Sequence, residues 1–202
     1  MVLRKFNQKG TTMIEMLGVL TIIIILGISS IKLIGNVYSL FKQGRVASEI
    51  RDLQKNISER YRFEGHYEDM LKNKTPEQTA AFLCDNKLAP IHMCYKGKIY
   101  NEMSGEVWIL PVSDGSNVVY DKYAVSFANL SKKACLNAAQ INWNTQNKVA
   151  VYKMIINSGT AKQVVVDVAH NVQSGSSAFP IKIEDAMKGC SNEYNTIQWV
   201  FF

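Results

Sequence analysis

The 202-residue sequence lacks the short motifs that identify most enzymes and nucleic-acid-binding domains. It contains no glycine-rich phosphate loop, no Gly-x-Ser-x-Gly turn around a nucleophilic serine and no His-Glu-x-x-His zinc helix. It also has no stripe of lysine and arginine with interleaved aromatic residues, as a basic nucleic-acid-binding surface would require. We therefore expect no enzyme, no cofactor and no direct binding of nucleic acid.

Cysteine is scarce, and its spacing argues against a metal site. No two cysteines form a Cys-x-x-Cys pair and no histidine lies at zinc-ligand spacing from a cysteine pair. The four residues are Cys84, Cys94, Cys135 and Cys190. An even number favours disulfides if the domain lies outside the cytoplasm. Four cysteines can be joined into two disulfides in three ways. We favour the arrangement that joins Cys84 to Cys94 and Cys135 to Cys190.

Histidine offers one candidate for catalysis. His66 and His170 are isolated, whereas His92 lies two positions before Cys94 and suggests a Cys–His dyad. A disulfide-bonded Cys94 is unable to act as a nucleophile. We therefore predict no catalytic residues and no metal ligands.

Charge is absent from a run of sixteen residues near the N-terminus, Met16–Ile31. As a helix this run would span about 24 Å, slightly less than the ~30 Å hydrocarbon core of a bilayer. One interpretation is a signal peptide, but no Ala-x-Ala cleavage site follows Lys32. Another is a transmembrane anchor, whose extension to Thr11 gives the required length but places Glu15 inside the span.

A third interpretation rests on the residues before that run, Lys9-Gly10-Thr11-Thr12-Met13-Ile14-Glu15. This stretch resembles the N-terminus of type IV prepilins and of type II secretion pseudopilins. It shares with them a basic leader that ends in glycine, an acid five positions after that glycine, and a following uncharged run. The resemblance implies a leader peptide at residues 1–10, cleaved between Gly10 and Thr11 by a prepilin peptidase. It further implies N-methylation of Thr11 and a role of Glu15 in assembly.

The charges at the N-terminus predict the topology of the precursor. Arg4, Lys5 and Lys9 precede the apolar run, and the positive-inside rule places such a flank in the cytoplasm. We expect a single-pass inner-membrane precursor whose transmembrane part covers about residues 11–34 and contacts the lipid bilayer before assembly. Its C-terminal head would be periplasmic, where disulfides persist.

The helical pattern continues beyond the apolar run. Apolar residues recur at spacings of four, three, four and four, which defines one face of an amphipathic helix. They are Val46, Ile50, Leu53, Ile57 and Tyr61. Charged residues, Glu49 among them, occupy the remaining positions, and Gly65 is a plausible end. The sequence predicts one helix over residues 11–63 with a globular head, residues 64–202, covering its apolar face.

The sequence of the head predicts two short helices and several strands. Thr75-Pro76-Glu77-Gln78 forms a capping box before a helix that reaches residue 86, and Ser131 caps a helix over residues 132–140. Strands are predicted at residues 106–111, 122–128, 149–156, 163–168 and 196–202. Among the turns, Gly97 marks one and Asp114-Gly115 another. The fold class is α+β, a long N-terminal helix packed on an antiparallel sheet.

Three segments of the head resemble type IVb pilins, including those of conjugative-plasmid thin pili. They are Ile99–Val107, Tyr123–Leu130 with the helix that follows, and the C-terminal run that begins at Asn195. The resemblance implies the pilin fold and a structural subunit of a type IVb-like pilus. Such a subunit forms a homo-oligomeric helical filament with the inner-membrane assembly machinery, ends in an extracellular pilus, and serves cell adhesion or conjugation.

Two other functions remain compatible with the sequence. A minor pilin, or a pseudopilin of type II secretion, would have the same subunit architecture at low abundance. A single-span anchored binding domain would differ in keeping residues 1–10, because it would not be processed.

Overall fold

The structure is a computed structural model that describes residues 13–112, 120–145, 148–149, 151–157, 160, 163–167 and 179–202. The chain divides into two units, Met1–Phe41 and Lys42–Phe202. Among the turns predicted from sequence, Asp114-Gly115 lies outside the described residues, as does the leader peptide at residues 1–10.

Helix α1 spans Met13–Arg60 and contributes to both units. It ends in a tightened turn, in which the N–H groups of Glu64 and Gly65 both donate to the carbonyl oxygen of Tyr61. Gly65 has a φ of +70°, the left-handed conformation that commonly terminates helices. The predicted end of the helix near Gly65 is confirmed. The helix itself stops at Arg60, three residues before the expected residue 63, because residues 61–64 form a turn.

The apolar segment of α1 was also predicted to cross a membrane. Within the described residues, the structure contains no helix with the combined length and apolar character that a membrane crossing requires. The predicted span of residues 11–34 includes positions 11 and 12, and the side chains of positions 27–34, which lie outside the described part of the chain.

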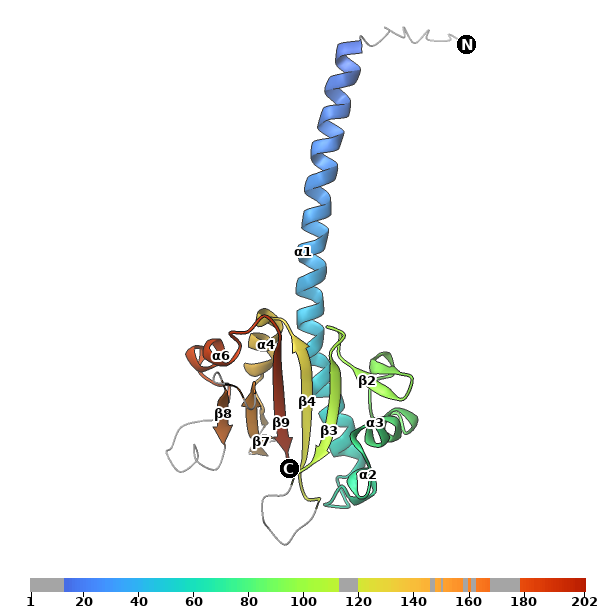
Figure 1. Ribbon diagram of the computed structural model, residues 1–202, viewed down its shortest axis with the longest axis vertical. Helices are drawn as coiled ribbons and strands as arrows, with labels where there is room; N and C mark the ends of the chain where they lie inside the picture. The colour runs from blue at the N-terminus through green and yellow to red at the C-terminus, as the bar shows by residue number, and fades with distance from the viewer. Residues whose placement is uncertain are drawn as a thin grey trace, which may run out of the picture. The chain divides into compact units, whose positions relative to one another are not determined.

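The second unit is built on a seven-stranded sheet with strand order β1-β2-β3-β4-β9-β7-β8, in which all neighbours are antiparallel (Figure 1). The strands in this order are Cys94–Tyr95, Lys98–Tyr100, Glu106–Pro111, Tyr123–Leu130, Asn195–Phe201, Val151–Ile156 and Val164–Asp167. A separate pair joins β5 (Asn144–Thr145) to β6 (Lys148–Val149).

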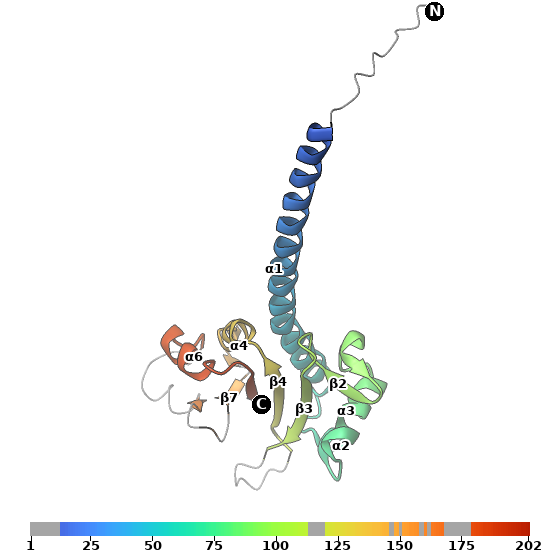
Figure 2. The ribbon, with the colours of Figure 1, turned by 45° about the horizontal axis from the view of Figure 1, so that its top comes forward.

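Short helices flank the sheet at its two sides. The first group, beside β2 and β3, is α2 (Glu68–Leu71), α3 (Pro76–Asp85) and the 3₁₀ helix η1 (Ile91–Met93). The second group, beside β9 and β8, is α4 (Lys132–Ala139) and α6 (Ile183–Gly189). Figures 1 and 2 show both groups on either side of the central strands.

The α+β fold class and the main elements are confirmed. The predicted strand at residues 106–111 is β3, and four further strands match to within a few residues. The Thr75 capping box forms in both directions, with the Gln78 N–H donating to Thr75 Oγ1 and the Thr75 N–H donating to Gln78 Oε1. The head contains more elements than expected, because seven were not predicted as separate elements: α2, α6, η1, β1, β2, β5 and β6.

The amphipathic face of α1 forms the centre of the core. The five apolar residues predicted from their spacing, from Val46 to Tyr61, are each at most 3% exposed. They lie against the sheet, whose strands contribute Val125 and Phe127 from β4 and Ile197 and Trp199 from β9 to the same cluster. Residues 42–60 of α1 are therefore held by apolar burial on one side only, as the sequence predicts.

The C-terminal strand β9 occupies the middle of the sheet, between β4 and β7. Phe201 is fully buried, and its ring lies 5.4 Å from that of Tyr123 and 5.3 Å from that of Trp143. The hydroxyl of Tyr67 donates to the carbonyl oxygen of Phe202 over 2.6 Å. Phe202 is thereby secured to the residue that precedes α2, while the Phe202 side chain itself is 54% exposed.

Both favoured disulfides are present. Cys84–Cys94 joins the end of α3 to β1, and Cys135–Cys190 joins α4 to the residue after α6. The Cα atoms are 5.8 and 5.7 Å apart, which is the usual separation. The first bridge closes a short local loop, whereas the second connects residues separated by 55 positions.

We predict that the two disulfides differ in their contribution to stability. In the chain-entropy model, loss of Cys135–Cys190 lowers the free energy of unfolding by about 4 kcal/mol, and loss of Cys84–Cys94 by about 3 kcal/mol. Cys135 and Cys190 are also fully buried, whereas Cys84 and Cys94 are only half-buried. Urea unfolding of the paired Cys→Ala variants measures both values. A larger loss from the Cys84–Cys94 pair would contradict the prediction.

Candidate functional site

The residues assigned to processing and assembly lie at the start of the chain. Gly10 and Thr11 fall outside the described residues, so cleavage and N-methylation there stay predictions. Glu15 lies in the first turn of α1. A carboxylate at this position is favoured by the positive end of the helix dipole.

The first unit presents apolar side chains on all sides of the helix. Between Met13 and Leu26 every large apolar side chain is at least 53% exposed. Four more exposed residues follow before the head begins, Val37, Tyr38, Leu40 and Phe41. Contiguous apolar surface of this kind marks a site of association, because each side chain gains about 1.5–3 kcal/mol when it leaves water.

The part of α1 in the second unit contains a charged residue at an unexpected depth. Glu49 is only 2% exposed, although its charge led us to place it on the solvent side of the helix. That expectation was wrong because Glu49 is three residues after Val46 and four before Leu53, which puts it on the packed face. Its helical spacing, rather than its residue type, was the signal that would have found it.

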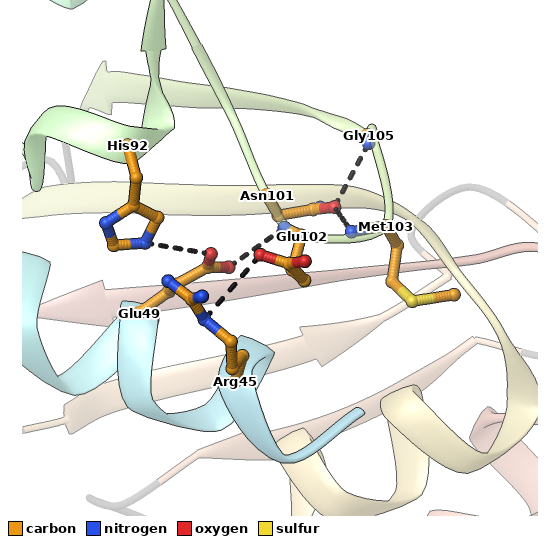
Figure 3. Close-up of polar contacts among 7 residues, drawn as sticks. All are labelled: Arg45, Glu49, His92, Asn101, Glu102, Met103 and Gly105. Atoms are coloured by element: carbon orange, nitrogen blue, oxygen red, sulfur yellow. Dashed lines mark hydrogen bonds and ion pairs between the residues drawn. The ribbon is translucent and has the colours of Figure 1, made fainter. Parts of the chain in front are cut away.

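Glu49 links α1 to η1 and to the turn after β2 (Figure 3). Its Oε1 lies 3.2 Å from His92 Nε2, and its Oε2 accepts a hydrogen bond from the backbone N–H of Glu102 at 3.1 Å. The carboxylate of Glu102 in turn lies 3.6 Å from Nε of Arg45, one turn earlier on α1. Burial raises the pKa of the Glu49 carboxyl, and the Glu102 N–H and the His92 imidazole oppose this increase.

The turn that positions Glu102 is fixed by Asn101 and Gly105. Asn101 Oδ1 accepts from the N–H groups of Met103 and Gly105 at 2.9 and 3.0 Å, and its Nδ2 donates to the carbonyl of Ala128 at 2.8 Å. A Cβ atom at Gly105 would lie 1.9 Å from that carbonyl oxygen, so only glycine fits. This turn is the first of the three segments that resemble type IVb pilins.

The sequence did not predict the contact of His92 with Glu49. His92 was considered only as a partner of Cys94, whose sulfur forms the disulfide with Cys84. The disulfide instead holds η1 and β1 beside α3, which places His92 over α1. Across the described residues, no group of three or more His, Cys, Asp or Glu side chains is arranged to hold a metal ion.

The raised pKa of Glu49 predicts a pH dependence of stability. Because the folded-state pKa lies above the usual value of 4.5, the native state binds a proton more readily than the unfolded state. The contribution of Glu49 is therefore fully present below pH 4.5 and is lost as pH rises through the folded-state pKa. Urea unfolding at a series of pH values from below 4.5 upward should show the free energy of unfolding of wild type falling relative to that of Glu49→Gln as pH rises.

Glu68 provides a control of opposite sign. A hydrogen bond from Lys72 lowers the pKa of this exposed carboxyl, so its contribution is lost as pH falls. Relative to Glu68→Gln, wild type should therefore lose stability toward acid. If the Glu49→Gln comparison shows the same sign as this control, burial does not dominate the titration of Glu49.

Comparison with known proteins identifies the fold. No family model and no curated protein matches the chain by sequence. The type IVb pilin of Salmonella typhi is similar in structure, with a TM-score of 0.51 and 12% identity over 77% of this chain and 97% of that one. TcpA, a type IV pilin of Vibrio cholerae El Tor, has a TM-score of 0.51 and 13% identity over 80% and 99%. The chain has the fold of type IV pilins.

Proposed function

We propose that this chain is the structural subunit of a type IVb-like pilus. The observation that carries the proposal is the exposed, predominantly apolar surface of α1 between Met13 and Leu26, in which Glu15 is the one charged residue, attached in sequence to a head with the pilin fold. A soluble domain does not need such a surface, and burying it among copies of the same helix would remove it from water. The similarity of the N-terminal sequence to type IV prepilins supports the same conclusion.

In this proposal the chain is made as a prepilin and cleaved after Gly10 by a prepilin peptidase. The new N-terminus at Thr11 is methylated, and the helix stays in the inner membrane until the assembly machinery transfers it to the filament. A periplasmic head fits the two disulfides, which persist outside the cytoplasm. Cleavage also removes Arg4, Lys5 and Lys9, the charges that would oppose burial of the N-terminus.

Glu15 would set the register between subunits. Cleavage creates a positive amino group at Thr11, four residues from Glu15 and thus about one helical turn away. In the apolar filament core the carboxylate of one subunit would pair with the amino group of its neighbour. Such a pair is strong at low dielectric, and removing one partner leaves an uncompensated buried charge that costs about 3–5 kcal/mol.

The N-terminus of the native protein tests the processing step. We expect mass spectrometry of chain purified from surface filaments to find Thr11 as the first residue, carrying one methyl group. The same preparation from cells without the prepilin peptidase should retain residues 1–10. Recovery of an intact Met1 from filaments would exclude the proposal and favour a membrane-anchored domain.

Replacing Glu15 tests the assembly step separately. Glu15→Ala should leave cleavage after Gly10 intact but abolish incorporation into sheared filaments, because the neighbouring amino group then lacks its counter-charge. Glu59→Ala is the matched control, since Glu59 is an exposed acid of the same helix and pairs with Lys55 at 3.9 Å in a solvated position. Normal filament yield from Glu15→Ala would show that Glu15 does not determine register.

A further inference from the structure

The face of the sheet opposite α1 carries a row of side chains that the apolar core does not use. Val125 and Phe127 of β4 belong to the core that α1 covers, so Ser126 between them points to the other face. The strand pairing places Trp108 of β3 and Gln198 of β9 on either side of Ser126. In Figure 1, α1 passes behind β3 and β4, and no helix of the described part of the chain lies in front of them. Side chains paired in this way have Cβ atoms about 4.5–5.5 Å apart, so the three form one continuous row.

The three side chains of this row can all form hydrogen bonds, and none of them does so with another described residue. Ser126 is only 6% exposed, so its hydroxyl lies at the bottom of the face with an unused donor and acceptor. A hydroxyl at this depth gains free energy when it acquires a partner. The indole of Trp108, which is 36% exposed, adds one donor, and the half-buried amide of Gln198 adds both donors and an acceptor.

The charges around this row are balanced. The adjoining row on the same face is apolar and consists of Leu110, Ala124 and Val200. The charged residues at the margins occur in pairs of opposite sign: Lys98 with Glu106 at 2.9 Å, Lys122 with Asp121 at 2.7 Å, and Lys153 opposite Asp167 in the strand register. An ionic ligand would therefore find no unmatched charge of either sign on this face.

The combination of an exposed ring with neutral hydrogen-bonding groups restricts the ligand further. A hydrocarbon would cover the indole of Trp108 but would leave Ser126 and Gln198 without partners, which costs free energy. A pyranose sugar has both of the features required. Its axial C–H groups form an apolar face that can stack on an aromatic ring, and its equatorial hydroxyls both donate and accept hydrogen bonds.

We propose that Trp108, Ser126 and Gln198 bind a neutral pyranose sugar. The apolar face of the sugar ring stacks on the Trp108 indole, as aromatic side chains with one polar group commonly pack at partly wet surfaces. The sugar hydroxyls bond to Ser126 Oγ and to the Gln198 amide, which fix the orientation of the ring.

Titration with methyl β-D-glucopyranoside tests the proposal on the full-length, unassembled chain, so the outcome does not depend on the proposed filament. Micelles of dodecylphosphocholine cover the apolar part of α1 and contain no sugar that would compete. We expect saturable transfer of NMR magnetisation from the protein to the glucoside. Sorbitol, which has the hydroxyls but no ring, and cyclohexanol, which has a ring but one hydroxyl, should show no saturable transfer.

Substitutions assign the binding to this face. Trp108→Ala should weaken binding of the glucoside at least about tenfold, because it removes the stacking surface. Ser126→Ala should weaken it about two- to tenfold, and keeps the test valid if Trp108→Ala does not fold, because it removes a single oxygen atom. Phe63→Ala is the matched control and should leave binding unchanged, since Phe63 is 93% exposed but lies in the turn after α1.

Two sets of results would overturn the proposal. The first is absence of saturation, equal binding of sorbitol or cyclohexanol, or an affinity in Trp108→Ala and Ser126→Ala equal to that of Phe63→Ala. The second comes from filaments, which should bind the glucoside as tightly as the unassembled chain does. Loss of binding on assembly would show that another copy of the chain covers this face, and that the face is a contact between subunits instead of a sugar site.

Discussion

One-sided burial of α1 between Val46 and Tyr61 is the interaction on which the head depends. The strands alone form a sheet with an uncovered apolar face, and the helix alone would expose a continuous apolar stripe. Their contact buries residues from both the helix and the sheet. On the sheet side, the rings of Phe127 and Trp199 meet edge to face at 5.9 Å. Residues 13–26 of the same helix differ because apolar side chains occur around its whole circumference and leave no polar side for water.

The segment between the helix and the sheet is held by different means. Its elements are short, so apolar burial alone gives each of them little stability. Specific links compensate: Asn56 Nδ2 donates to the carbonyl of Leu88 at 3.1 Å, Glu49 contacts His92 and the Glu102 backbone, and Cys84–Cys94 closes the loop covalently.

Sequence alone predicted the features that repeat or that have a local chemical signature. The period of Val46–Tyr61 identified the packed face, and the capping residues Thr75 and Ser131 located the starts of α3 and α4. The missed elements are too short to show a period: β1 and β2 form a hairpin joined by Lys96 and Gly97, both at positive φ. Glu49 was misplaced because its charge was weighted above its spacing, and its partners lie 43 and 53 residues away.

The two units differ in how far their own residues can satisfy their polar and apolar groups. The head satisfies its buried asparagines internally: Asn195 accepts from Asn157 at 2.8 Å and donates to the carbonyl of Leu130 at 3.2 Å. These two asparagines are thus committed to partners within the head. Residues 13–26 have no comparable internal solution, because an apolar cylinder is stabilised only by other apolar surface. Apolar contact lacks direction, and in the proposed filament Glu15 in the first turn would give such contact a defined register.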